Sequence, residues 1–518
     1  MRVDYELHKH FEDSVEKMVE VYGEKFLKLN GLSNEHLNGT GFIDNFIDKQ
    51  TVSDASIDGN ANVGTKDICS MTSEKNKSTD KLLAFNKIFY ELEKKHGLEK
   101  AQKWLEGEWN GAFYMHDASS ATFVPYCFAY DLEPLVEKGL FFIDNFSGGA
   151  PKHLTTFTDF VVEWVCYASS RSSGAVGLPN FLIYSYYFWK KDCETGHFIK
   201  DPEYYCRQEF QRIIYKLNQP YVRINQSAFT NVTIYDKPYL EALFGGKEYP
   251  DGSAVIDYID EICEYQKIFM EVCSEVRNAN LMTFPVLTFA LLYDGTQFVD
   301  EEFAMWACRH NMKWGDSNFF VSEDVTSLSN CCRLISDVKD LGFFNSIGGT
   351  ALEVGSVKVN TINLARIAYE ADGDREAYFE ILAEKVQLCC ETLDIVRSII
   401  SRNIEKGLLP NYTHKLINLS SQYNTIGILG IYETLKFFGH VIVDEFGNSS
   451  YDSAGVQFAE DILAKINECR IDFMKNVDYK INVEQIPGER AAAILMQKDK
   501  LLFPNGIYEL PLYGNQWI

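Results

Sequence analysis

Strand-like and helix-like segments alternate along this chain from about residue 80 onward. The strand-like segments are rich in β-branched and aromatic residues; they read "TFVPYCFAYDL", "SAFTNVTIYD", "TFPVLTFALLYD", "KVNTINLARI" and "NTIGILGIY". Helical patterns lie between them, at about 156–170, 258–277, 300–313, 374–405 and 455–475. This alternation predicts a largely parallel sheet or an α/β barrel, because parallel strands need crossover connections that are usually helices.

The first 78 residues have a different pattern. Residues 4–28 predict one amphipathic helix, because apolar side chains recur there at three- and four-residue intervals. The stretch from about 31 to 78 is rich in Ser, Asn, Asp and Gly and predicts an irregular segment. We therefore expect an N-terminal helix and irregular segment over 1–78 and the main domain over 79–518.

Composition excludes several classes of protein. A net charge of −25 argues against non-specific nucleic-acid binding, which needs a basic face, although helix N-termini could still hold the phosphates of a nucleotide. No apolar run approaches bilayer length, so we expect a cytoplasmic protein without membrane contact. The thirteen cysteines should be mostly free thiols, and none forms a CxxC pair, so we expect no metal bound by this chain.

Two pairs of adjacent cysteines differ in their surroundings. Cys389 lies in a helical stripe of apolar residues, which predicts that it and Cys390 fill the core. Cys331 and Cys332, in "SNCCRLISD", have no such stripe and precede a Gly-rich run, which predicts a loop. Adjacent cysteines are poor disulfide partners for each other. From the residues alone, reactive chemistry and a structural thiol remain equally open for this pair.

The chain resembles the anaerobic (class III) ribonucleoside-triphosphate reductases, which are glycyl radical enzymes. The motifs that carry the resemblance occur in the family's order. They are "WNGAFYMHDASSATFVPYCFAYDL" (109–132), "SSGAVGLPNF" (172–181), "NQSAFTNVTIYD" (225–236), "NCCRL" (330–334), "GSVKVNTINLARI" (355–367), "NTIGILGIYETL" (424–435), "NVEQIPGERAA" (482–492) and "LYGNQWI" (512–518).

The resemblance implies a ten-stranded α/β barrel, made of two five-stranded parallel halves, with a cysteine-bearing loop in its centre. It makes Cys332 the radical carrier, which takes the 3′-hydrogen of the ribose. Cys127 is then the thiol that reduces from the opposite face, although on the residues alone it would be a core residue. Asn330 could bond a ribose hydroxyl or act as a turn residue. Cys331 could supply a second thiol or face away.

The segment "QIPGERAAAILMQKD" has Pro-Gly before a helix-forming run, which is a possible phosphate site as well as an ordinary helix start. The resemblance supports substrate binding by Pro487, Gly488 and Glu489. His116 and Asp117 could form an acid–base pair, but a structural role is the more common one for such a pair at a strand end.

The chain departs from the family pattern in three places. "EVGS" (353–356) lacks the asparagine of the formate-using members, so a redoxin could be the reductant. The N-terminus lacks the ATP-cone. The chain stops at "NQWI", where the family continues to its glycyl radical loop, so we expect a separate C-terminal piece that carries the radical. Gly514 is interpreted as a turn glycine rather than as the radical site.

These features predict an enzyme that reduces ribonucleoside triphosphates for DNA synthesis. The resemblance implies a homodimer, nucleotide effectors, and a partner activase with a 4Fe-4S cluster and S-adenosylmethionine that generates the glycyl radical. Two alternatives remain from the sequence. One is another glycyl radical enzyme, and the other is a catalytically silent nucleotide-binding subunit.

Overall fold

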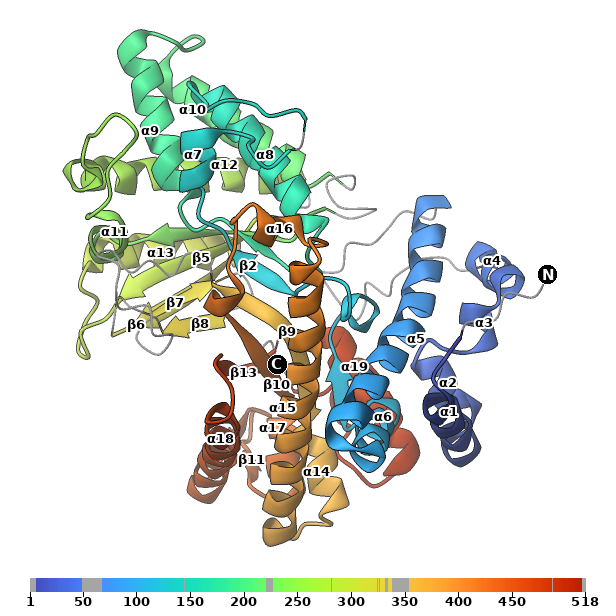
Figure 1. The fold of residues 1–518 in the computed structure, drawn as a ribbon. Helices are drawn as coiled ribbons and strands as arrows, with labels where there is room; N and C mark the ends of the chain where they lie inside the picture. The colour runs from blue at the N-terminus through green and yellow to red at the C-terminus, as the bar shows by residue number, and fades with distance from the viewer. Residues whose placement is uncertain are drawn as a thin grey trace. The chain divides into compact units, whose positions relative to one another are not determined.

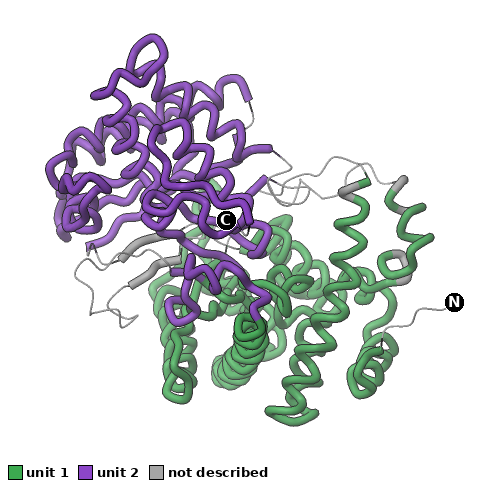
Figure 2. The backbone as a smooth tube through the Cα atoms, turned by 45° about the horizontal axis from the view of Figure 1, so that its top comes forward, with its two compact units in different colours: residues 1–125, 356–406, 423–518 green, residues 126–355, 407–422 purple. Residues whose placement is uncertain are grey.

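The structure is a computed structural model that describes residues 6–48, 68–143, 145–219, 227–280, 282–323, 325, 327–330, 334–337, 354–486 and 488–514. The chain forms two compact units (Figure 2). Unit 1 comprises residues 1–125, 356–406 and 423–518, and unit 2 comprises residues 126–355 and 407–422. The predicted domain boundary at residue 78 stays a prediction.

The N-terminal part of unit 1 corrects two expectations. Instead of one helix over 4–28, the chain forms α1 (Lys9–Tyr22) and α2 (Glu24–Leu29). Gly23 separates them with a φ of 77°, a backbone conformation that glycine adopts without a steric penalty. The segment predicted to be irregular contains α3 (Asn34–Leu37) and α4 (Gly39–Asp48), and α5 (Ile68–His96) begins within it.

The rest of unit 1 surrounds a small sheet. Strand β13 (Ile481–Gln485) pairs in parallel with β10 (Gln422–Leu429). Strand β9 (Gly355–Asn363) is hydrogen-bonded to β10 and pairs antiparallel with β1 (Phe113–Met115). All residues of β9 except Gly355 belong to unit 1. The helices of this part are α6 (Leu98–Asn110), α14 (Leu364–Glu370), α15 (Arg375–Glu405), α17 (Ile431–Phe437), α18 (Ser453–Met474) and α19 (Glu489–Leu502). A hairpin of β11 (Val441–Val443) and β12 (Ser449–Tyr451) completes it.

Unit 2 contains a five-stranded parallel sheet. Its strands, in spatial order, are β2 (Cys127–Ala129), β3 (Val176–Gly177), β4 (Thr230–Tyr235), β5 (Val286–Leu292) and β6 (Ser317–Ser322). This confirms the prediction of a mixed α/β fold with a parallel half. In unit 1 the described strand β1 is antiparallel, so the count of ten strands stays a prediction.

The helices of unit 2 bury the apolar face of its strands. They are α7 (Glu133–Lys138), α8 (Leu154–Ser169), α9 (Phe181–Thr195), α10 (Pro202–Leu217), α11 (Lys237–Phe244), α12 (Ile259–Ala279), α13 (Glu301–Trp314) and α16 (Pro410–Thr413). Helices α8, α9, α10 and α12 gather on one side of the strands (Figure 1), and their side chains form one continuous apolar cluster with β4 and β5. None of the helices in the described part of the chain is long and apolar enough to cross a membrane.

Candidate active site

Cys127 is the first residue of β2, and its side chain is fully buried. Two glycines of unit 2 lie against it. A Cβ atom on Gly174 would be 3.1 Å from the Cys127 Cβ, and one on Gly355 would be 2.2 Å from the Cys127 carbonyl oxygen. No side chain fits on Gly355 at this distance from a backbone atom, and one on Gly174 would force a neighbour to shift. These glycines therefore allow neighbouring segments to approach β2 closely. This packing explains one glycine in each of the motifs "SSGAVGLPNF" and "GSVKVNTINLARI", and it holds the Cys127 thiol in place.

The second cysteine site lies between two short strands. Strand β7 (Ser327–Asn330) pairs antiparallel with β8 (Leu334–Asp337), with Asn330 opposite Leu334, and β7 lies against β5 and β6 of the same unit. Cys331 and Cys332 belong to the three residues that connect these strands, which lie outside the described residues. The roles predicted for them, and for the Asn330 side chain, stay predictions.

By contrast, Cys389 and Cys390 are core residues, as their helical stripe predicts. Both are fully buried in α15, and burial raises the pKa of each thiol above its ordinary value. A raised thiol pKa suppresses the reactive thiolate. This pair therefore fills space and takes no part in a site.

In unit 1, polar side chains lie around a glycine of β10 and on the strands next to it. Gly427 is opposite Glu484 of β13, and paired residues of parallel strands point to the same side of a sheet. A Cβ atom on Gly427 would be 2.1 Å from Oγ1 of Thr361 on β9. Thr361 Oγ1 is hydrogen-bonded to Nε2 of His116, at 2.9 Å. We call Glu484, Thr361 and His116 the polar strand face.

Both titratable groups of the polar strand face favour their neutral forms. Burial raises the pKa of Glu484 well above its usual range, and its Oε1 has no hydrogen-bond partner among the described residues. Burial lowers the pKa of His116 to about 4. Both side chains remain in part accessible to solvent. Desolvation together with partial access is typical of catalytic acids and bases.

The predicted phosphate site is next to this face. Gly488 precedes α19 and Glu489 is its first residue, whereas Pro487 lies outside the described residues. A Cβ atom on Gly488 would be 3.3 Å from Cε1 of His116, so the imidazole packs directly against the start of α19. The first N–H groups of a helix have no partner within the helix and attract anions. Unit 1 thus places the neutral imidazole of His116 beside this helix start, and the binding of phosphates there stays a prediction.

His116 and Asp117 do not form the acid–base pair considered above. The described contacts give His116 a bond to Thr361 and none to the Asp117 side chain. Asp117 has a φ of 43°, and its carbonyl oxygen accepts a hydrogen bond from Lys358 Nζ at 2.9 Å. Asp117 therefore bonds Lys358 through its backbone, and its carboxylate acts on His116 only through its charge.

A buried charge network explains further motif residues that the sequence left without a role. The Asp499 carboxylate accepts hydrogen bonds from Arg366, from Asn363 Nδ2 at 2.9 Å and from Tyr513 Oη at 2.6 Å. Arg366 also donates to the carbonyl oxygen of Asn110 at 2.9 Å. Arg366 and Asp499 are at most 1% exposed. The network joins three motifs that are far apart in the chain to Asp499 of α19, so these residues hold unit 1 together.

Gly514 has a structural contact, and its interpretation as a turn glycine stays a prediction. Its N–H lies 3.0 and 3.1 Å from the two carboxylate oxygens of Glu433, and its carbonyl oxygen accepts from Gly430 N at 2.8 Å. Burial raises the pKa of Glu433 to about 7.

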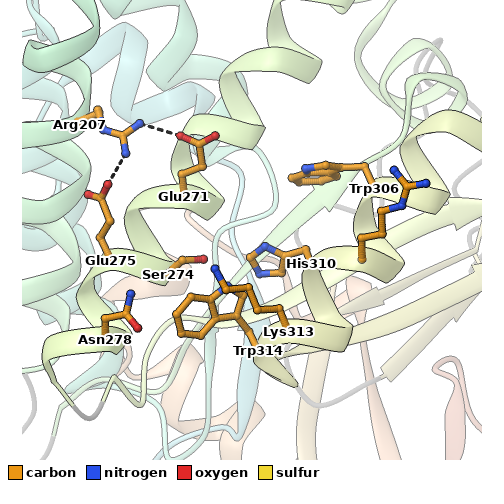
Figure 3. Close-up of a pocket in the computed structure, with 10 residues that line it drawn as sticks. Arg207, Glu271, Ser274, Glu275, Asn278, Trp306, His310, Lys313 and Trp314 are labelled. Carbon is orange, nitrogen blue, oxygen red and sulfur yellow. Dashed lines mark hydrogen bonds and ion pairs between the residues drawn. The ribbon is translucent and has the colours of Figure 1, made fainter.

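A surface hollow of about 450 Å³ in unit 2 contains none of the predicted site residues (Figure 3). It is lined by Arg207, Glu271, Ser274, Glu275, Asn278, Trp306, Arg309, His310, Lys313 and Trp314. Arg207 lies beside Glu271 and Glu275 at one side of the hollow and bonds to both, at 2.8 and 2.6 Å. These exposed ion pairs already satisfy its acidic groups, and we assign it no catalytic role.

Comparisons with known proteins agree with the geometry. The family model of the anaerobic ribonucleoside-triphosphate reductases matches residues 73–517. The anaerobic ribonucleotide reductase of Thermotoga maritima in complex with dATP and CTP is 38% identical, with a TM-score of 0.89, over 100% of this chain and 82% of that chain. The Thermotoga maritima enzyme with citrate in its active site is 37% identical, with a TM-score of 0.88, over 100% of this chain and 90% of that one. The comparison with curated proteins gives no match.

Proposed function

Since the chain belongs to the anaerobic ribonucleoside-triphosphate reductase family, it is an enzyme that reduces ribonucleotides without oxygen, and we propose which of its residues carry out each step of this reaction. The substrate is a ribonucleoside triphosphate, as the family's description indicates. The observation that carries the proposal is Cys127, a buried thiol held on β2 by two glycines that belong to the family motifs.

The two cysteine sites supply the redox chemistry. Cys332, as a thiyl radical, takes the hydrogen atom from C3′ of the ribose and returns it at the end of the cycle. The C2′–O bond breaks in between, and the hydroxyl leaves as water. Cys127 and Cys331 provide two electrons and two protons: one hydrogen replaces the hydroxyl at C2′, the other leaves in the water, and the two sulfurs end as a disulfide. Asn330 bonds a ribose hydroxyl.

Unit 1 binds the triphosphate and assists the leaving group. Pro487, Gly488 and Glu489 present the start of α19 to the phosphates, which its backbone N–H groups neutralise. The neutral Glu484 carboxyl, four residues before Gly488, gives its proton to the leaving 2′-hydroxyl and regains the proton that disulfide formation releases. His116 stays neutral, is hydrogen-bonded to Thr361 and packs against Gly488, so it supports the start of α19 without adding charge.

We propose the partners by analogy with the family. A radical-SAM activase with a 4Fe-4S cluster generates the glycyl radical that oxidises Cys332. The Thermotoga maritima enzyme has been solved with dATP bound in its specificity site, which supports nucleotide effectors for this chain as well. We further propose a homodimer in the cytoplasm.

The test is turnover of CTP by the chain with activase, S-adenosylmethionine, reductant and a source of the glycyl radical. Cys332→Ser should abolish both dCTP formation and exchange of the 3′-hydrogen, because the serine O–H bond is too strong for radical formation. Cys127→Ala should abolish dCTP but keep 3′ exchange. Cys308→Ser, at an exposed cysteine of α13, is the matched control and should keep wild-type turnover. Wild-type dCTP yield from Cys127→Ala would refute the assignment.

The reductant can be identified in the same assay. Without external reductant, one turnover should leave a disulfide between Cys127 and Cys331, which peptide mass spectrometry detects. Carbon dioxide from labelled formate, with both thiols still reduced, would contradict the role of Cys331.

A further inference from the structure

Two histidines before and within the first turn of α1 lie beside a glutamate of α5. His10 Nδ1 is 2.7 Å from Glu93 Oε1, and His8 Nδ1 is 3.5 Å from Glu93 Oε2. One donor atom of each of the three residues lies within 4.8 Å of the other two. All three belong to unit 1, and none takes part in the sites described above.

Two of these donor atoms are buried and lack a hydrogen bond. Neither His8 Nδ1 nor Glu93 Oε2 has a hydrogen-bond partner among the residues that the structure describes. Burying a polar atom without a partner is unfavourable. A proton on His8 would relieve this through a long ion pair with Glu93, and a cation held between the two atoms would relieve it more completely.

The rest of the cluster holds these atoms in place. The backbone N–H of His8 donates to Oδ1 of Asn86 on α5, at 2.8 Å. The centroid of the His8 ring is 5.1 Å from that of Tyr90, which is also on α5. His10 is hydrogen-bonded to Glu93 and remains half exposed. The histidines therefore present their Nδ1 atoms to one carboxylate without further rearrangement of the backbone.

A similar cluster in unit 2 is less suited to a metal. The Asp192 carboxylate there already accepts from His153, from Leu154 N at 2.8 Å and from Tyr205 Oη at 3.0 Å. The rings of His153 and His197 stack with centroids 3.7 Å apart and planes 22° from parallel. The lone pair of an imidazole lies in the plane of its ring, so two stacked rings converge poorly on one ion.

We propose that His8, His10 and Glu93 bind a divalent transition-metal ion of the zinc type, with a water molecule in the fourth position. Two imidazoles and a carboxylate match the ligand preference of zinc and its neighbours, whereas calcium and magnesium prefer oxygen ligands alone. The sequence predicted no metal because it lacks a CxxC pair, but a site of this kind needs no cysteine. The bound ion ties the start of α1 to the end of α5.

The test is to measure zinc binding to the full chain by equilibrium dialysis. The wild type and the variants are measured in parallel, because all of them carry the same thiols and any zinc bound to thiols then cancels in the comparison. His10→Ala and Glu93→Gln should each bind one zinc ion fewer per chain, or bind it at least about tenfold more weakly. His197→Ala, in the second cluster, is the control and should bind as the wild type does.

A thermal readout separates a metal site from an ion pair. Zinc should raise the Tm of the wild type and of His197→Ala, and leave the Tm of His10→Ala and Glu93→Gln unchanged. Retention of the ion by either of these two variants, or its loss from His197→Ala alone, would overturn the proposal. In that case, the cluster is a histidine–carboxylate ion pair.

Discussion

Two polar regions of unit 1 differ in whether their acidic group has a charged partner. Asp499 is contacted by Arg366, Asn363 and Tyr513, whereas Glu484 has an oxygen without a hydrogen bond in the described part of the chain. Burial raises the pKa of Asp499 too, but Arg366 and Tyr513 oppose that shift. For Glu484 burial alone acts and favours the neutral acid. A buried acid with partners stabilises the fold, and one without them is available to a substrate.

Breaking the paired region should have the largest effect on stability. Arg366→Met leaves the Asp499 carboxylate buried without its cation, so we expect a loss of about 3–5 kcal/mol in the free energy of unfolding. Urea titration measures this. Arg375→Met is the matched control, because its ion pair with Asp461 is exposed and should be worth about 1 kcal/mol or less. Equal losses in the two variants would contradict the assignment.

Glu484→Gln should separate chemistry from stability. The amide keeps the shape of the side chain but cannot transfer a proton, so turnover of CTP should fall about 100-fold or more. The urea midpoint at neutral pH should not decrease, since the variant removes no partner of the carboxyl. If stability falls and turnover does not, Glu484 belongs with Asp499 as a structural residue.

Gly355→Ala tests whether a side chain is tolerated at Gly355, which lies against the Cys127 backbone of β2. The new methyl group would meet the Cys127 carbonyl oxygen, so we expect a loss of about 1–3 kcal/mol and reduced turnover. Gly246→Ala in the same unit has open space around its Cβ position and no positive φ, so its stability should stay near that of the wild type. Normal stability of Gly355→Ala would show that β2 can move aside.

His116 should make the smallest contribution, and it depends on pH. Its pKa is lowered from 6.5 to about 4, so the folded state binds fewer protons than the unfolded state between these values. Stability is therefore full above pH 6.5 and is lost as the pH falls toward 4. Between pH 7 and pH 5, the urea concentration at the unfolding midpoint should fall less for His116→Gln than for the wild type. The same pH response in both chains would mean that His116 titrates normally.

Local patterns predicted most of the regular elements. Helices α12 and α15 and strands β4 and β5 lie where apolar periodicity and β-branched residues placed them. These features are readable because a helix or strand that buries one face must repeat apolar residues at its own period. The break at Gly23 was missed because the apolar spacing continues across it.

The sequence by itself determined the family, the cysteine candidates and the helix start at Gly488, because each is carried by neighbouring residues. Only the tertiary structure decided what the polar motif residues do. Arg366 meets Asp499 across 133 positions, and His116 meets Thr361 across 245. The protonation of Glu484 depends on burial by distant segments of the chain. Partnership and desolvation arise from contacts between remote parts of the chain, and no local pattern encodes them.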